Sequence, residues 1–279
     1  MIKSYCKINL SLRVIKKLRN GLHDIQSNTL LLDLHDSIKI NRINKKKDVI
    51  VFTGRFKKSV NNLKNSVSST LSILRANQFL KKEKKYKIIV NKKIPVFSGL
   101  GGGTSNAAFV IKYFLKSKID NKVIKIFEEK IGSDLRFFFN KQVYQKNLRK
   151  LIKYKKNFNF YFVLVYPNIK CLTKKIYSKV KKYSSPSKIN TSKILSKNNF
   201  IYLMKKEEND LQKIATQKFN VLEKVLNFIS IQKDCYFSRI TGSGSVCFGM
   251  FKSRKSAILG LKIIKKKFPK YWSIVTKTI

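Results

Sequence analysis

The first strand of the chain is predicted by strict alternation of apolar and polar residues over positions 7–14. The apolar positions all fall on one face, at Ile8, Leu10, Leu12 and Val14. This two-residue period is typical of a strand with one buried face, so Lys7 and Asn9 are expected together on the opposite, polar face. Shorter runs predict further strands at residues 27–34, 37–40, 49–52 and 86–90, and a helix over residues 63–79.

A glycine-rich loop that leads into a helix is the clearest local feature of the first half. Pro95, Gly99 and the three glycines at 101–103 exclude regular structure up to Thr104. From there apolar residues recur at helical spacing, at Ala107, Ala108, Val110, Ile111, Phe114 and Leu115. Such a loop lets backbone N–H groups converge on an anion while the helix dipole adds positive potential, which indicates a phosphate-binding loop. A plain flexible loop is the alternative, and the lack of Gly-Lys-Ser/Thr excludes a Walker A loop.

The second half alternates strand and helix patterns in the order of an α+β protein. Strands are expected at residues 159–166, 235–240, 246–251 and 272–276, and helices over 211–229 and 257–267. Because residues 142–156 are rich in lysine and weakly patterned, we place a domain boundary there. The sequence therefore predicts an α+β fold of two domains, residues 1–150 and 151–279.

Composition and charge narrow the class of protein. The chain has 279 residues, 43% of them hydrophobic, which is enough apolar surface for a folded protein. Lys and Arg total 62 against 14 Asp and Glu, a net charge of +48. Sites that read nucleic acids rely on the forked guanidinium of Arg, but only 9 of the 62 cations are Arg and the lysines occur in every segment. Most of this charge is therefore interpreted as solvated surface, with a polyanion-binding patch as the alternative.

Membrane and metal sites are not expected from the sequence. The longest uncharged run, residues 94–111, contains proline and glycines and is shorter than the roughly 20 apolar residues of a membrane-spanning helix. No signal-peptide core follows the first methionine. The four cysteines form no Cys-x-x-Cys pair, and the only histidines are His23 and His35, so no zinc site is expected. We expect a cytoplasmic protein with reduced thiols and no membrane or specific nucleic-acid partner.

Asp134 is the carboxylate best placed in the sequence to act as a general base. It follows Gly132 and Ser133 and precedes an apolar aromatic run that can partly bury it, and Lys7 is a candidate cationic partner. A role as helix cap or turn residue remains the alternative for Asp134. His23 is equally compatible with a turn, and residues 241–245 with a plain tight turn between strands.

Together these segments resemble the GHMP kinase superfamily. The most specific match is residues 95–108, which are similar almost letter for letter to the family's Pro-x-x-x-Gly-Leu-Gly-Gly-Gly-Ser-Ser-Asn-Ala-Ala motif. Five other family motifs resemble segments of this chain in the same order, at residues 6–10, 20–23, 132–138, 209–211 and 241–245. The resemblance implies a mixed α/β nucleotide-binding domain followed by a ferredoxin-like α+β domain.

The resemblance also implies roles for individual residues. Asp134 would be the catalytic base, Lys7 its cationic partner, and Asn9, His23 and Tyr177 would hold the substrate. ATP, accompanied by Mg²⁺, would be bound by a larger set of residues around the glycine loop. These residues are Asn62, Lys92, Pro95, Gly99, Leu100, Gly101, Gly102, Gly103, Thr104 and Ser105. Residues 242–245 would pack beside this loop and close the cleft between the domains.

Within the superfamily, the triple glycine and the Gly-Leu-His sequence favour one branch. That branch phosphorylates the 2-hydroxyl of a cytidyl-diphosphate sugar alcohol in the non-mevalonate route to isoprenoids, and its members are cytoplasmic monomers or homodimers. Two departures stand out, because Leu22 replaces a tyrosine that can stack on cytosine and Arg136 replaces a proline after the proposed base. Another small-alcohol kinase, a basic nucleic-acid-binding protein and a degenerate kinase fold remain alternative functions.

Overall fold

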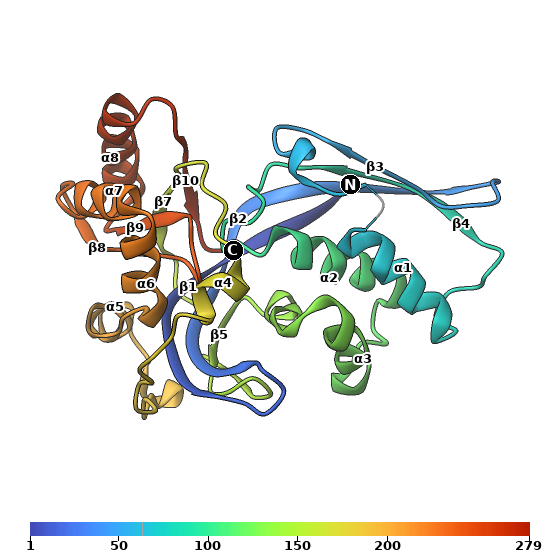
Figure 1. Ribbon diagram of the computed structural model, residues 1–279, viewed down its shortest axis with the longest axis horizontal. Coiled ribbons are helices and arrows are strands. Elements are labelled where there is room, and N and C mark those ends of the chain that lie inside the picture. The colour runs from blue at the N-terminus through green and yellow to red at the C-terminus, as the bar shows by residue number, and fades with distance from the viewer. Residues whose placement is uncertain (63) are drawn as a thin grey trace. The chain divides into compact units, whose positions relative to one another are not determined.

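The computed structural model describes residues 1–62 and 64–279 and contains eight α-helices and ten strands among them (Figure 1). The chain forms two compact units, each built from separate stretches of sequence. Unit 1 comprises residues 1–7, 34–96 and 101–140, and unit 2 comprises residues 8–33, 97–100 and 141–279. Strands β1 (Ile2–Lys17) and β2 (His23–Ile43) contribute residues to both units.

Unit 1 contains part of a mixed sheet and a group of helices. Its further elements are β3 (Val49–Thr53), the 3-10 turn η1 (Lys57–Ser59), α1 (Ser66–Ala76), β4 (Lys85–Asn91), α2 (Gly102–Leu115), α3 (Asn121–Ile131) and the 3-10 helix η2 (Ser133–Phe139). Strand β4 pairs antiparallel with β2 and parallel with β3. Helix α1 packs against α2 and α3, and η2 packs against the same two helices (Figure 1). The glycine loop predicted from the sequence lies directly before α2.

Unit 2 contains a four-stranded antiparallel sheet in the order β10-β7-β9-β8. Its elements are β5 (Gln142–Gln145), β6 (Leu151–Lys153), β7 (Tyr161–Tyr166), α4 (Thr173–Tyr177), η3 (Thr191–Lys193), α5 (Lys197–Lys206), α6 (Asp210–Lys218), α7 (Asn220–Ser230), β8 (Cys235–Ile240), β9 (Cys247–Phe251), α8 (Arg254–Lys267) and β10 (Trp272–Lys277). Helices α7 and α8 lie against this sheet (Figure 1). The order strand, helices, two strands, helix, strand is the predicted ferredoxin-like α+β arrangement, which is confirmed.

Most predicted elements are present, with three differences in detail. The two strands predicted at 27–34 and 37–40 are one continuous strand, β2. The single helix predicted over 211–229 is two helices, because Phe219 leaves helical geometry between α6 and α7 with φ −135° and ψ 82°. Residues 142–156, whose weak pattern predicted no element, contain β5 and β6, which pair with each other. The predicted domain limits at residues 150 and 151 stay a prediction.

The strand at the amino terminus is confirmed, but the prediction that its polar face is exposed is wrong. Lys7, Asn9 and Ser11 are only 4, 2 and 1% exposed. Side chains of β2 compensate the burial of Asn9 and Ser11. Asn9 Nδ2 donates to Ser27 Oγ at 2.8 Å, and Ser11 Oγ accepts from Asn28 Nδ2 at 2.8 Å. Alternation in the sequence therefore separates an apolar face from a polar face. It does not show whether the polar face is solvated or buried and hydrogen-bonded.

The core of unit 2 forms where α7 and α8 cover the sheet. Apolar side chains from β7, α7 and α8 meet there, among them Val163, Val165, Leu222, Val225, Ile229, Ala257 and Ile264. Gly260 of α8 lies directly over the ring of Phe251. No helix of residues 1–62 and 64–279 is long and apolar enough to cross a membrane.

The contact at Gly260 gives a stability prediction. A Cβ atom there would lie 2.9 Å from Cε1 and 3.0 Å from Cζ of Phe251. Overpacking of this kind costs about 1–3 kcal/mol, whereas glycine to alanine in a helix returns only about 1 kcal/mol. Gly260→Ala should therefore lower the free energy of unfolding, as measured by urea denaturation. Lys262→Ala, an exposed change on the same helix, should stay within about 0.5 kcal/mol of wild type; equal or greater stability of Gly260→Ala would contradict the packing.

Candidate active site

Lys7 and Asp134 form the central ion pair of unit 1. Lys7 Nζ of β1 lies 3.4 Å from Asp134 Oδ2, in the first turn of η2. The Lys7 side chain is 5% exposed and that of Asp134 is 42% exposed. The carboxylate is therefore held by a buried cation and still faces solvent, which is the arrangement a general base requires.

Gly132 places Asp134 at this position. It ends α3 and begins η2 with φ 125°, in a backbone region that side chains rarely adopt. The chain can therefore turn sharply between the two helices, so that Asp134 enters the first turn of η2. The predicted pairing of Asp134 with Lys7 is confirmed, whereas Asp134 lies inside η2 and is neither a helix cap nor a turn residue.

Lys112 of α2 anchors the segment that carries Asp134. Its Nζ donates to the carbonyl oxygen of Phe138 at 2.6 Å and lies 4.4 Å from the centre of the Phe109 ring. Burial lowers the pKa of Lys112 to about 8. Arg136, on the same segment, forms an ion pair with Glu128 of α3. Sequence reasoning did not identify Lys112, because its motif-free position in a helix resembles that of any other surface lysine.

The glycine loop has the geometry of an anion cradle. Gly101 has φ 68°, and a Cβ atom there would lie 2.9 Å from Phe138 and 3.3 Å from Lys7. Helix α2 begins at Gly102, two residues before the predicted start, and its first turn has no side-chain cap. Bare backbone N–H groups at a helix amino terminus attract phosphate. The loop therefore places the uncapped amino terminus of α2 beside Lys7 of the Lys7–Asp134 pair.

A buried polar network lies beneath this loop. Lys92 Nζ pairs with the carboxylate of Asp36 and donates to Asn106 Oδ1 at 3.0 Å. Asp36 is fully buried and also accepts the backbone N–H groups of Lys93 and Ile94 at 2.7 and 2.9 Å. A Cβ atom on Gly102 would lie 3.4 Å from Lys92 Nζ. The predicted nucleotide contact of Lys92 stays a prediction, and its described partners tie β2, β4 and α2 together.

The other nucleotide residues predicted in unit 1 surround the start of α2. Ser105 is fully buried, and its hydroxyl donates to the Tyr5 carbonyl at 2.6 Å. Ser66, at the start of α1, donates to the Gly103 carbonyl at 2.6 Å. Asn62 is exposed just before that helix, and its carbonyl accepts from Asn65 at 3.1 Å. Pro95 is buried, and Thr104 is half-buried in the first turn of α2.

Gly99 and the 241–245 loop approach each other closely within unit 2. Gly99 has φ 82°, and a Cβ atom there would lie 2.2 Å from the Thr241 carbonyl oxygen. The backbone N–H of Val246 donates to Ser98 at 3.1 Å, and Thr241 Oγ1 accepts the N–H of Asn9 at 3.0 Å. The predicted packing of this second loop beside the start of the glycine loop is confirmed for residues 98 and 99. Leu100, next in the chain, is fully buried.

His23 and Tyr177, predicted to hold substrate, lie together in unit 2. Their ring centres are 5.0 Å apart, and the planes of the two rings are tilted by 35°. The ring centre of Tyr183 lies 6.5 Å from that of His23. Burial and then the charge of Lys17 lower the pKa of His23, so the imidazole is neutral at pH 7. Leu22, which precedes His23 in the sequence, is 50% exposed. Tyr183 was not identified from the sequence, because it lies in a lysine- and serine-rich stretch without a pattern.

The predicted residues thus fall into two groups. Lys7, Asp134, Lys92, Ser105 and the glycines 101–103 gather in unit 1. Asn9 and Gly99 contact Thr241 of the 241–245 loop in unit 2. The same unit contains Leu100 and the paired rings of His23 and Tyr177. No group of three or more His, Cys, Asp or Glu side chains that could hold a metal ion occurs in the described part of the chain.

The fold and these motifs define a GHMP kinase. The family described as GHMP kinases N terminal domain matches residues 65–140, and that described as GHMP kinases C terminal matches residues 192–270. A solved structure of 4-(cytidine 5'-diphospho)-2C-methyl-D-erythritol kinase has a TM-score of 0.74, at 20% identity, over 99% of this chain and 98% of that one.

Sequence comparison then gives the particular family. The 4-diphosphocytidyl-2-C-methyl-D-erythritol kinase of Pelagibacter ubique is 36% identical over 283 residues, covering 100% of this chain and 98% of the relative. The protein of the same name from Buchnera aphidicola is 32% identical, over 91% and 85% of the two chains. The chain belongs to the family of 4-diphosphocytidyl-2-C-methyl-D-erythritol kinases, and the superfamily resemblance read from its motifs is confirmed.

The Lys92–Asp36 pair gives a prediction about stability. Asp36→Asn keeps an acceptor for the neighbouring N–H groups but leaves Lys92 a buried cation without its anion, which should cost about 3–5 kcal/mol of unfolding free energy. The double variant Asp36→Asn/Lys92→Met should be more stable than Asp36→Asn alone, because it removes the unpaired charge. Urea unfolding of wild type, Asp36→Asn, Lys92→Met and the double variant measures this cycle. Additive effects of the two changes would show that the pair is not coupled.

Lys112 gives a prediction about pH. Because burial lowers its pKa from 10.5 to about 8, the unfolded chain keeps a proton between these pH values that the folded chain has released. The free energy of unfolding rises with pH wherever the unfolded state binds more protons. Wild type should therefore gain stability relative to Lys112→Met as pH rises from about 8 to about 10. Urea unfolding at several pH values tests this, and a constant or falling difference would contradict it.

Proposed function

We propose that this protein transfers the γ-phosphoryl group of ATP to the 2-hydroxyl of 4-diphosphocytidyl-2-C-methyl-D-erythritol, in the non-mevalonate synthesis of isoprenoid precursors. The observation that carries the proposal is the contact between the glycine loop and the ion pair. A Cβ atom on Gly101 would touch Lys7, whose Nζ pairs with Asp134 at 3.4 Å. A phosphate on the loop and a hydroxyl on Asp134 would therefore be neighbours. The names of the relatives supply the substrate.

In this proposal Asp134 is the base and Lys7 its positioning cation. The Asp134 carboxylate accepts the proton of the substrate hydroxyl, and the Lys7 ammonium holds the carboxylate in position. Because Lys7 is 5% exposed, little water competes for its charge. Phosphoryl transfer depends mainly on position and charge stabilisation, and backbone N–H groups of residues 102–104 supply both to the phosphates.

ATP and Mg²⁺ fit this site in different ways. Neighbouring side chains already occupy the place that a Cβ atom would take at Gly101 and Gly102, so the loop has bare backbone there, which suits contact with a phosphate. Mg²⁺ is commonly bound through substrate phosphates with one or two carboxylates, and Asp134 is the carboxylate of the site. When bound, the ion would neutralise charge on the transferring group. The predicted contacts of Asn62, Lys92, Pro95, Thr104 and Ser105 with the nucleotide are part of this proposal.

The cytidine end of the substrate is assigned to unit 2. His23 and Tyr177 offer a neutral imidazole beside an aromatic face, which suits a pyrimidine that needs stacking and a hydrogen bond. Asn9 holds the sugar alcohol through its position on β1. We further propose a cytoplasmic monomer or homodimer with the family domains 1–150 and 151–279. The cytoplasm suits cysteines that form no disulfide, which here are Cys6, Cys171, Cys235 and Cys247.

Asp134→Asn tests the proposed chemistry. Loss of the base should lower kcat for phosphoryl transfer to 4-diphosphocytidyl-2-C-methyl-D-erythritol by about 10²–10⁴-fold, while the variant still binds ATP. The assay follows the phosphorylated product by mass spectrometry, with homoserine and mevalonate as competing acceptors. Glu129→Gln, an exposed carboxylate of α3, is the matched control and should keep the wild-type rate.

Three outcomes would contradict the proposal. A near-normal rate for Asp134→Asn would remove it as the base. Faster transfer to homoserine or mevalonate would assign another substrate within the GHMP kinases. Tight binding of RNA with a steep salt dependence and no transfer to any alcohol would favour the polyanion-binding alternative instead.

A further inference from the structure

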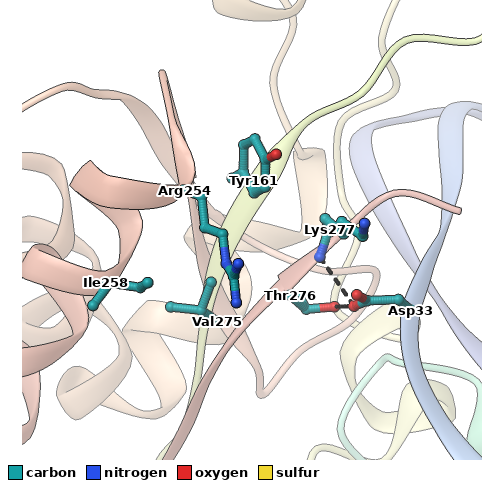
Figure 2. A pocket seen from close by; sticks show the side chains of 7 residues that line it. All are labelled: Asp33, Tyr161, Arg254, Ile258, Val275, Thr276 and Lys277. Carbon is teal, nitrogen blue, oxygen red and sulfur yellow. Dashed lines mark hydrogen bonds between the residues drawn. The ribbon is translucent and has the colours of Figure 1, made fainter.

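Unit 2 contains a pocket that none of the predicted site residues lines. It has a volume of about 320 Å³ and lies between β2, β7, α8 and β10 (Figure 2). This volume is at the lower end of the range for small-molecule sites. All of its lining residues belong to unit 2, so its shape does not depend on residues of unit 1.

One wall of the pocket is held rigid by hydrogen bonds at the end of β10. Asp33 Oδ1 accepts from the hydroxyl of Thr276 and from the backbone N–H of Lys277 at 3.1 Å (Figure 2). Lys277 is also the antiparallel partner of Tyr161 on β7. The charge of Asp33 is thus compensated by two donors of β10, and the backbone on this side is preformed.

Arg254 supplies a cation on the opposite side. It is the first residue of α8, and its guanidinium reaches down beside Val275, between Ile258 and Thr276 (Figure 2). In the described part of the chain it has no hydrogen bond or ion pair. By contrast, Arg13, Arg75 and Arg136 all bind carboxylates.

The position of Arg254 does not serve the stability of its helix. A cation in the first turn of a helix opposes the helix dipole, and the first turn of α8 contains no acidic residue to balance it. The same dipole adds to the attraction of Arg254 for an anion in the pocket. Lys277 contributes a second positive charge to the lining. The electrostatics of the pocket therefore favour a negatively charged group.

The remaining lining is apolar. Ile258 is 39% exposed, and its side chain lines the pocket together with Val275 and the ring of Tyr161 (Figure 2). Inorganic anions gain nothing from such surface, whereas an aromatic or branched aliphatic group buries it. We propose that this pocket binds a small organic anion, with its phosphate or carboxylate on Arg254 and its apolar part against Ile258, Val275 and Tyr161.

Titration calorimetry of the full chain with phenyl phosphate tests this site. A saturating non-hydrolysable ATP analogue with Mg²⁺ is present throughout, so that the glycine loop cannot take the probe. We expect saturable binding with a Kd of about 1 mM or below. Inorganic phosphate lacks the apolar ring and benzyl alcohol lacks the anionic group, so each should bind at least about tenfold more weakly. Benzoate in place of phenyl phosphate tells whether the pocket prefers carboxylate to phosphate.

Arg254→Gln and Lys255→Gln form the matched pair of variants. Both remove one charge from the first turn of α8, but only Arg254 lines the pocket. Arg254→Gln should weaken phenyl phosphate binding at least about tenfold, and Lys255→Gln less than about twofold. Neither change should lower the thermal unfolding midpoint, because each removes a cation from the helix amino terminus.

Several results would overturn the assignment. One is that phenyl phosphate does not saturate the protein up to about 10 mM, and another is that inorganic phosphate binds as tightly as phenyl phosphate. A third is an equal loss of affinity in Arg254→Gln and Lys255→Gln, which would mean a general effect of the cationic surface. The experiment does not measure phosphoryl transfer. Failure of this site is therefore distinguishable from failure of the proposed kinase function, and both variants are expected to keep the kinase rate.

Discussion

The buried pair of Lys92 and Asp36 is the constraint on which the rest of unit 1 depends. A cation that is 2% exposed and a carboxylate that is fully buried are stable only together. Both also bind Asn106 in α2, and Asp36 accepts two backbone N–H groups that follow β4. The pair therefore fixes the start of α2 relative to the sheet. Because the glycine loop opens directly onto that start, its shape follows from this contact rather than from the glycines alone.

The glycines act where backbone meets backbone or side chain at short range. At Gly99 the obstacle is the Thr241 carbonyl, and at Gly101 it is the ring of Phe138 and the stem of Lys7. Both residues also have positive φ, so a substitution would be strained even with space. The two constraints place Lys7 against the loop. The Lys7–Asp134 ion pair thereby lies directly beside the glycine loop.

The parts of the structure that the sequence predicts are those set by local rules. The glycine loop, α2 and the order of strands and helices in the second half follow from turn chemistry and periodicity, which depend on neighbouring residues. The ferredoxin-like arrangement of that half followed from the family resemblance. The Asp36–Asn106 contact joins residues 70 positions apart; Asn106 belongs to the glycine-loop motif, but no motif marks Asp36 as its partner. Tyr183 reaches His23 through a stretch whose composition predicts little structure. The buried polar face of β1 was mispredicted for the same reason, since its cover comes from distant residues.

Scarcity of acids explains why one carboxylate can be singled out. With 14 Asp and Glu against 62 cations, most acids that form ion pairs do so inside the fold. The side chains of Asp36, Glu207, Glu128 and Asp48 are 0, 6, 10 and 17% exposed in their pairs. Asp134 is 42% exposed while its cation is buried. A purely structural pair gains most when both partners are enclosed and hydrogen-bonded. An open carboxylate on a buried ammonium instead keeps its charge available to a hydroxyl, which is why we assign the chemistry to this pair.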